Sequence, residues 1–391
     1  MPPTRGVLVT VGLQSIGRPR VKPEHRAYRT TDGHVRIGSV IYGIGAEVLD
    51  PDGWVWSLIE AMDGTRSVPS VLATVRETHP EVPMEDLREA LADLLAAGFV
   101  EDAAAPVPPE LSEREQDRYS RSVPLQRWMD LTPRRSPWDV QLRLRNSRVL
   151  LLGVGGTGGY AAQTLVASGV GHLHCVEPDV VERSNLNRQP LFAEKDIGLP
   201  KLDAALDALR ARNPDVTVTG ERREVRDPDD LAELMSPGYD LLLLAADRPP
   251  EIRRWANRRC LATGTPWVDA GYHGPLVTVG VHRPGSGACW ECHRAGEVAR
   301  RDLRVGPGQD EEVASPRLDW NPANAVTAAL SGTLQTHAAL ALLTGVPAME
   351  PGFRFGINLM VPGDPVLERF DRLPDCPACG DVPGRPQDTD G

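Results

Sequence analysis

The stretch Arg148-Val-Leu-Leu-Leu-Gly-Val-Gly-Gly-Thr-Gly158 decides the fold of most of this chain. Its first five residues form an apolar run bounded by glycines, which is typical of a β-strand buried on both faces. Its glycines, Gly153, Gly155, Gly156 and Gly158, allow a tight turn and let backbone N–H groups approach a phosphate at the start of a helix. The stretch therefore predicts a strand, a phosphate-binding turn and a helix in succession.

Strand and helix patterns alternate after this stretch. We expect helices over 159–168 and 201–212, and further strands at 172–176 and 239–246. This alternation predicts an α/β domain with a doubly wound, Rossmann-like, mostly parallel sheet. Such sheets bind ligands at the carboxyl ends of their strands.

An acidic residue ends the second predicted strand. Glu177 lies 19 residues after Gly158, where an acid commonly binds the ribose hydroxyls of a nucleotide. These features alone fit an NAD-dependent dehydrogenase as well as another nucleotide-binding protein. The sequence has no Gly-x-x-x-x-Gly-Lys-Ser/Thr motif, which excludes P-loop chemistry.

Two cations and one carboxylate also follow the predicted strands. Arg188 and Lys201 come after the second strand, and Asp247 closes the strand that begins at Tyr239. A dehydrogenase does not need these charges, whereas a triphosphate does, because the cations offset its charge and a carboxylate binds Mg²⁺. The alternative is that Arg188 and Lys201 are solvated surface cations.

At these positions the sequence resembles the ThiF/MoeB-type adenylyltransferases, which are relatives of the ubiquitin-activating enzymes. The resemblance implies binding of Mg-ATP and transfer of AMP to the C-terminal carboxylate of a small protein or peptide. The chain departs from the family at Glu177, where Asp is usual, and at Arg248, where a small polar residue is common. The matching motifs lie between about Arg118 and Cys379 and include Arg118-Tyr-Ser-Arg121, the glycine-rich stretch, Ser184-Asn-Leu-Asn-Arg-Gln189, Gly198-Leu-Pro-Lys201, Asp247 and two Cys-x-x-Cys pairs.

The resemblance also implies a role for each site residue. Glu177 would bind the ribose, Asp247 would bind magnesium, and Arg121 would reach across the interface of a homodimer to the triphosphate. The residues implied to contact the phosphates are Asn185, Arg188 and Lys201. The predicted nucleotide-binding residues are Gly153, Gly155, Gly156, Gly158, Glu177, Asp179, Asn185, Arg188, Gln189 and Lys201, and the predicted catalytic residues are Arg121, Arg188, Lys201 and Asp247.

The expected reaction is in-line attack of a substrate carboxylate on the α-phosphorus of ATP, which gives an acyl-adenylate and pyrophosphate. The protein mainly positions the reactants and stabilises their charge. A carboxylate is already ionised at neutral pH, so no general base is required.

Four of the six cysteines form two Cys-x-x-Cys pairs. In a reducing compartment this pattern favours metal binding over disulfides, and four thiolates suit a closed tetrahedral zinc site. A redox motif is the alternative for either pair alone. The predicted zinc ligands are Cys289, Cys292, Cys376 and Cys379.

The other two cysteines, Cys175 and Cys260, lie in a predicted strand and a predicted helix, so we expect them to be core residues. Some relatives pass the acyl group to a cysteine in the crossover segment. The sequence has none between Arg294 and Trp320, so we expect no thioester stage.

Residues 20–103 form a separate predicted domain, followed by a Pro- and Ala-rich linker at 104–117. Two short strands around 36–45 and three amphipathic helices predict a small winged-helix-like α+β fold. The segment resembles the PqqD-type domains, which bind the leader segment of a precursor peptide as an added strand at their sheet edge. A structural appendage is the alternative. We assign 118–380 to the ATP-binding domain with its zinc knuckles and 381–391 to a disordered tail.

Composition limits the partners and the location of the protein. The chain has 54 acidic against 43 basic residues, and 14 of the acids lie between Asp32 and Asp102 beside four arginines. A nucleic-acid partner is not expected, because it needs a basic surface. We find no apolar stretch near the ~20 residues of a membrane helix and no signal peptide, so we expect a cytoplasmic protein without membrane contact.

Three functions remain open at this point. The first is an enzyme that binds a precursor peptide through its N-terminal domain and adenylates a carboxylate in the synthesis of a modified ribosomal peptide, as in microcin C synthesis. The second is a non-catalytic leader-binding partner of a YcaO cyclodehydratase, and the third is an adenylyltransferase for a sulfur-carrier protein. We favour the first because the ATP-binding residues are intact. A further biosynthetic enzyme would then be another partner.

Overall fold

The computed structural model describes residues 12–300, 304, 306, 318 and 320–380. By its contacts the chain divides into unit 1, Met1–Arg143, and unit 2, Leu144–Gly391. Residues 118–143, which we assigned to the ATP-binding domain, thus group with the N-terminal part of the chain. The predicted tail at 381–391 lies outside the described residues.

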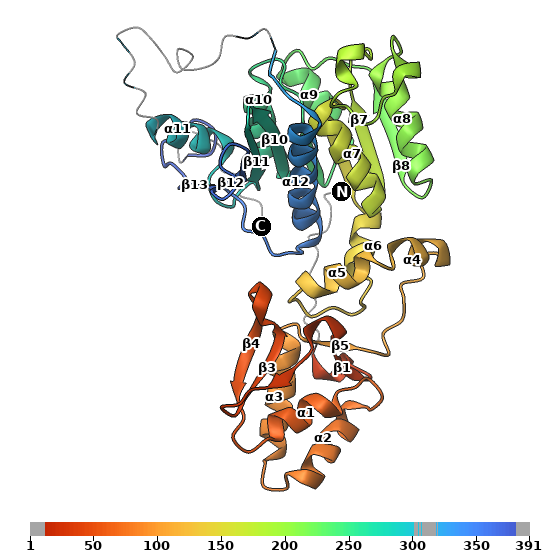
Figure 1. Ribbon diagram of the computed structural model, residues 1–391, viewed down its shortest axis with the longest axis vertical. Coiled ribbons are helices and arrows are strands. Elements are labelled where there is room, and N and C mark those ends of the chain that lie inside the picture. The colour runs from red at the N-terminus through yellow and green to blue at the C-terminus, as the bar shows by residue number, and fades with distance from the viewer. Residues whose placement is uncertain (1–11, 301–303, 305, 307–317, 319, 381–391) are drawn as a thin grey trace. The chain divides into compact units, whose positions relative to one another are not determined.

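Unit 1 combines two small sheets with helices (Figure 1). Within its described residues, β1 pairs with β5, and β2, β3 and β4 form an antiparallel sheet in that order. The strands are β1 (Pro19–Val21), β2 (Tyr28–Arg29), β3 (His34–Ser39), β4 (Ile44–Leu49) and β5 (Val100–Asp102). The helices are α1 (Trp54–Ala61), α2 (Val68–Thr78), α3 (Met84–Ala96), α4 (Glu113–Tyr119), α5 (Ser122–Met129) and α6 (Asp139–Arg145), which runs across the division.

The strand pair and the three amphipathic helices of the N-terminal segment lie where the sequence predicts them, as β3, β4, α1, α2 and α3. Their apolar side chains meet in one core that includes Ile37, Leu58 and Leu91. Part of the predicted linker is helical, because the side chains of Ser112 and Glu115 form a capping box at the start of α4.

Unit 2 is built on one sheet, whose described strands follow the order β13-β12-β11-β10-β9-β6-β7-β8. From β10 to β8 the strands run parallel, which confirms the predicted Rossmann-like sheet, and β11, β12 and β13 extend it in antiparallel fashion. The strands are β6 (Arg148–Leu152), β7 (His172–Val176), β8 (Thr217–Glu221), β9 (Leu241–Leu244), β10 (Trp267–His273), β11 (Leu276–His282), β12 (Phe353–Asn358) and β13 (Pro365–Arg369). The helices are α7 (Gly156–Ser168), α8 (Lys201–Arg212), α9 (Pro228–Met235), α10 (Ile252–Thr263), α11 (Trp290–Arg300) and α12 (Ala325–Thr344).

Alternate residues of each central strand pack to opposite faces of this sheet. On β6, Val149 and Leu151 join a core with α7, α8 and α12, whereas Leu150 and Leu152 join a core with α9 and α10. Helices therefore cover both faces. This explains why β6 is apolar from Val149 to Leu152 instead of alternating between apolar and polar residues.

The sequence analysis missed several elements of unit 2, among them β8, β10, the three antiparallel strands and the helix α12. By length and composition α12 could cross a membrane, so the expectation that no apolar stretch approaches this length is wrong. In the structure α12 packs beside α7 against the sheet (Figure 1). Gly332 permits this close contact, since a Cβ there would lie 2.3 Å from the backbone oxygen of Thr157.

Candidate nucleotide site

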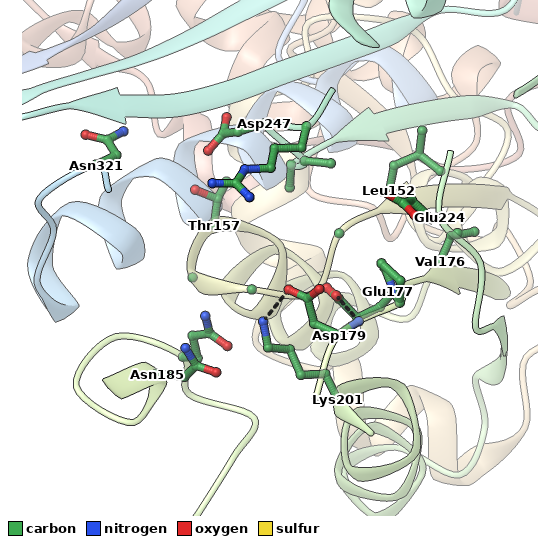
Figure 2. A pocket seen from close by; sticks show the side chains of 18 of the residues that line it. Leu152, Thr157, Val176, Glu177, Asp179, Asn185, Lys201, Glu224, Asp247 and Asn321 are labelled. Carbon is green, nitrogen blue, oxygen red and sulfur yellow. Dashed lines mark hydrogen bonds and ion pairs between the residues drawn. The ribbon is translucent and has the colours of Figure 1, made fainter. Parts of the chain in front are cut away.

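The carboxyl ends of β6, β7 and β9 border a cavity of about 700 Å³ in unit 2 (Figure 2). The glycine-rich turn and the loops that follow these strands supply its walls, as expected for a doubly wound fold. The predicted site residues that line it are Gly153, Gly155, Gly156, Glu177, Asp179, Asn185, Arg188, Gln189, Lys201 and Asp247.

Three glycines of the turn are required for different structural reasons. Gly153 has a φ of +89°, a conformation that favours glycine, and it brings the chain round at the end of β6. Gly156 begins α7, and a Cβ there would lie 3.4 Å from the hydroxyl of Tyr272, inside the cavity wall. Gly158 instead packs against the turn, because a Cβ there would lie 1.9 Å from the backbone oxygen of Gly153.

Glu177 holds the turn in place. Its buried carboxylate accepts hydrogen bonds from the backbone N–H of Val154 at 2.8 Å and of Asp179 at 3.0 Å. Each carboxylate oxygen can accept a further hydrogen bond. The residue can therefore shape the glycine loop and also accept hydrogen bonds from ribose hydroxyls.

Lys201 and Asp179 form an ion pair at the cavity wall, 2.9 Å between Nζ and Oδ2 (Figure 2). The Lys201 side chain is 8% exposed and the Asp179 side chain is 64% exposed, so the lysine is the buried partner of this ion pair. The backbone N–H of Lys201 also donates to the backbone oxygen of Asp179, which ties the start of α8 to the loop after β7.

The second cation, Arg188, follows a short 3-10 turn at Arg183–Asn185. The Asn185 side chain accepts from the backbone N–H of Glu182 at 2.9 Å, and the Asn185 carbonyl accepts from Arg188 and Gln189. The guanidinium of Arg188 donates to the Ser184 carbonyl at 2.8 Å. Asn185 thus holds the loop that carries Arg188 along the cavity.

Gln189 lies at the wall of the cavity, beside the glycine turn. Its Oε1 is buried without a hydrogen-bond partner among the described residues, and its amide lies 3.6 Å from where a Cβ of Gly155 would stand. Unpaired buried polar atoms are rare and call for an explanation. The glycine cradle and the two cations together fit a bound nucleotide phosphate chain, whereas the amide oxygen can only accept a hydrogen bond, as from a hydroxyl group of a ligand.

Asp247 lies on the other side of the cavity from Lys201 (Figure 2). Its carboxylate is 69% exposed and accepts a hydrogen bond from Arg253 at 3.0 Å. An accessible carboxylate beside a phosphate-binding loop has the chemistry of a Mg²⁺ ligand.

The sequence analysis missed further residues of the cavity wall, among them Thr157, Tyr272 and Asn321. Burial raises the pKa of Tyr272, whose hydroxyl is hydrogen-bonded to Arg188, and the Asn321 side chain donates to the Tyr272 carbonyl at 2.5 Å. Tyr272 stands near the end of β10, so prediction of that strand would have pointed to it.

Two residues predicted for this site do not line the cavity: Gly158, which packs against the turn, and Arg121. Arg121 is exposed at the start of α5 in unit 1, whereas the cavity is lined by residues of unit 2. Its role in catalysis stays a prediction, since it depends on a second copy of the chain.

The four cysteines of the Cys-x-x-Cys pairs come together, with all sulfur atoms within 4.8 Å of one another. Three of the Sγ–Sγ distances are 3.8, 3.7 and 3.5 Å. A tetrahedral zinc ion with Zn–S bonds of about 2.3 Å requires S–S separations of about 3.8 Å. The cluster of Cys289, Cys292, Cys376 and Cys379 therefore has the spacing of a metal site.

Cys175 and Cys260 are buried in β7 and α10, as predicted. Burial raises the pKa of the Cys175 thiol to about 12 and also raises that of Cys260. Both are therefore neutral thiols at physiological pH and unsuited to act as nucleophiles.

Comparison with known proteins places these features in a family. The family model named ThiF family matches residues 119–372. The chain is 31% identical over 275 residues to the SAMP-activating enzyme E1 of Haloferax volcanii, a match that spans 69% of this chain and 91% of that protein. It is 32% identical over 286 residues to the sulfur carrier protein adenylyltransferase of Thermus thermophilus, spanning 70% and 93%.

Solved structures with the same fold include MccB of E. coli, with a TM-score of 0.74 at 23% identity over 93% of this chain and 97% of that chain. MccB has also been solved with ATP and, as the microcin C7 biosynthetic enzyme, with N-formylated MccA. At this identity the likeness shows the fold, and it extends over both units of the chain.

Proposed function

The chain belongs to the ThiF family of E1-like adenylyltransferases, and from this premise we propose that it uses ATP to activate a carboxylate of a precursor peptide as an acyl-adenylate. It is a nucleotidyltransferase, as its family relatives are. The peptide substrate and its place in the synthesis of a modified ribosomal peptide are our proposal.

One observation carries the nucleotide part of the proposal. A single cavity brings together the glycine turn, Glu177, the cations Arg188 and Lys201, and Asp247. Two cations and a carboxylate in one site suit a triphosphate with Mg²⁺. This set supports ATP over a nicotinamide dinucleotide.

In the proposed reaction, the N–H groups of the glycine turn and the start of α7 bind phosphate oxygens, and Glu177 binds the ribose. An oxygen of the substrate carboxylate attacks the α-phosphorus, the bond from that phosphorus to the bridging oxygen breaks, and pyrophosphate leaves with the electron pair. Arg188 and Lys201 offset the charge that builds up on the leaving group. Mg²⁺ held by Asp247 would screen the triphosphate when bound.

We further propose that Arg121 completes the site from the second subunit of a homodimer. The reaction needs no base, because the attacking carboxylate is ionised. It also needs no thioester stage, since the sequence has no cysteine between Arg294 and Trp320. The cysteine cluster would hold a structural zinc ion.

Unit 1 is proposed to bind the leader segment of the peptide, as a PqqD-like, winged-helix-like domain. In its described part β4 stands at the edge of the sheet β2-β3-β4, where an extended peptide could add a strand. The similar fold of MccB, solved with N-formylated MccA, supports a peptide substrate. We propose a cytoplasmic location, with no nucleic-acid or membrane partner and with a further biosynthetic enzyme acting on the product.

A second candidate is activation of a sulfur-carrier protein. It is favoured by the two relatives at 31% and 32% identity, one named a SAMP-activating enzyme E1 and the other a sulfur carrier protein adenylyltransferase. The third candidate, a non-catalytic partner of a YcaO cyclodehydratase, has less support, because the predicted ATP-binding residues are present around one cavity.

The test is ATP–pyrophosphate exchange by the full chain, with synthetic peptides encoded beside its gene or with a small carrier protein that ends in Gly-Gly. We expect exchange that requires both peptide and ATP. Asp247→Asn should lower the exchange rate by about 100-fold or more, because a bound metal is worth several kcal/mol of charge stabilisation. Exchange with the carrier protein alone would favour the second candidate, and peptide binding without exchange would favour the third.

A further inference from the structure

Arg253 lies between two carboxylates of unit 2. Its Nη2 is 3.0 Å from Oδ1 of Asp247, and its Nε is 3.5 Å from Oδ2 of Asp269. The three side chains are exposed to different degrees: 69% for Asp247 at the cavity (Figure 2), 24% for Arg253 and 9% for Asp269. The arginine thus links a buried carboxylate to the one that faces the nucleotide site.

The buried end of this link is held rigidly. His282 donates from Nε2 to Oδ1 of Asp269 at 2.9 Å, and its ring stacks on Trp267 with the centroids 4.3 Å apart. Gly280 faces Asp269 across the β10–β11 pair, and a Cβ there would lie 2.3 Å from the Asp269 carboxylate. Asp269 therefore has one well-defined position, and it fixes Arg253 in turn.

We propose that Arg253 is a positioning residue that holds Asp247 through Oδ1 and leaves its second oxygen for the metal ion. The inference rests on the proposed function, in which Asp247 binds Mg²⁺. An aspartate this exposed would otherwise sample several rotamers, and fixing it before binding lowers the entropic cost. Asp269 balances the charge of Arg253. Arg253 therefore orients Asp247 without adding a net positive charge beside the Mg²⁺ ion.

The test compares the affinity of the full chain for ATP with and without Mg²⁺, by isothermal titration calorimetry. In the unmodified protein Mg²⁺ should tighten ATP binding. Arg253→Met should reduce this Mg²⁺-dependent gain by about 3- to 10-fold, the effect of freeing one ordered side chain, and leave the affinity for metal-free ATP unchanged. Asp269→Asn should act in the same direction, because it leaves the charge of Arg253 unbalanced.

The matched control is Arg254→Met, which removes the adjacent, exposed arginine of α10 and should leave the gain unchanged. Because Arg253→Met leaves Asp269 buried without its cation and could prevent folding, Arg253→Lys provides a second variant. Lysine keeps the charge but loses the fork that reaches both carboxylates, so the gain should fall with it as well.

The outcomes separate this inference from the proposed function. If Asp247→Asn keeps the full gain, Asp247 is not the metal ligand and the magnesium assignment fails. If Asp247→Asn abolishes the gain but the two Arg253 variants retain it, the positioning role is overturned and the magnesium assignment stands. Loss of the gain in Asp247→Asn together with a reduced gain in both Arg253 variants, with Arg254→Met unaffected, supports the positioning role of Arg253.

Discussion

Single side chains set the shape of the nucleotide site before any ligand binds. Glu177 holds the glycine turn through two backbone N–H groups, and Lys201 is kept at the cavity wall by Asp179. Asp247 is held in the same way by Arg253. Glu177, Lys201 and Asp247 are therefore already paired within the protein, which pre-organises the site.

Gly158 offers a test of this arrangement at the scale of one residue. A Cβ there would meet a backbone oxygen at 1.9 Å, which cannot move aside as a side chain could. We expect Gly158→Ala to lower the free energy of unfolding by about 1–3 kcal/mol, as for other overpacked sites, measured by urea denaturation. Gly363→Ala, where a Cβ would have nothing within 4 Å, is the control and should change it by less than about 0.5 kcal/mol. Equal stability of the two variants would contradict the close contact between α7 and the turn.

At the scale of elements, the cysteine cluster joins segments that are far apart in sequence. Cys289 and Cys292 lie at the start of α11, whereas Cys376 and Cys379 follow β13. The backbone N–H of Leu373 donates to the Cys292 sulfur at 3.4 Å, and the side chain of Asn257 donates to Cys289 at 3.6 Å. Such contacts orient thiolate ligands and stabilise their charge.

We expect the purified protein to contain about one zinc ion per chain, in a site of four thiolates. Removal of zinc with a chelator should lower the thermal midpoint and open the segment after β13 to proteolysis, because like-charged or protonated sulfurs would no longer hold the two segments together. Metal analysis and limited proteolysis provide the readouts. Cys376→Ser should lose the metal, whereas Cys260→Ala, which alters a buried cysteine outside the cluster, should retain it. Full zinc content in Cys376→Ser would rule out this ligand set.

At the scale of the whole molecule, the proposed function assigns separate tasks to the two units. Unit 1 offers the edge of β4, and unit 2 holds the cavity. Arg121 belongs to unit 1, so the proposed trans-acting arginine lies in the same unit as the proposed peptide-binding sheet.

Hydrogen–deuterium exchange on the full chain tests the peptide-binding role. With a peptide encoded beside the gene, backbone amides in Ile44–Leu49 should exchange more slowly, because an added strand pairs with the free edge of β4. A scrambled peptide of the same composition should have no effect. Protection confined to unit 2 would show that the peptide binds elsewhere.

Local sequence patterns determine much of this architecture. The apolar run at Arg148–Leu152 followed by glycines specifies a buried strand and a phosphate-binding turn, because both depend on the neighbouring residues alone. The two Cys-x-x-Cys pairs indicate their metal site by spacing. Parallel strands end at the same edge of a sheet, so the positions of Glu177, Lys201 and Asp247 along the chain already predict a shared cavity.

Other features depend on contacts between distant residues, and no local pattern encodes them. The helix α12 carries small and apolar residues over most of its surface, and α7 and the sheet bury much of it. It therefore lacks the strong amphipathic period by which helices are recognised. Tyr272 reaches the cavity, and Arg253 reaches Asp247, only because β10 and α10 pack beside β9 and α9. Folding brings these side chains within a few ångströms of Arg188 and Asp247, and their ion pairs and hydrogen bonds arise from that proximity.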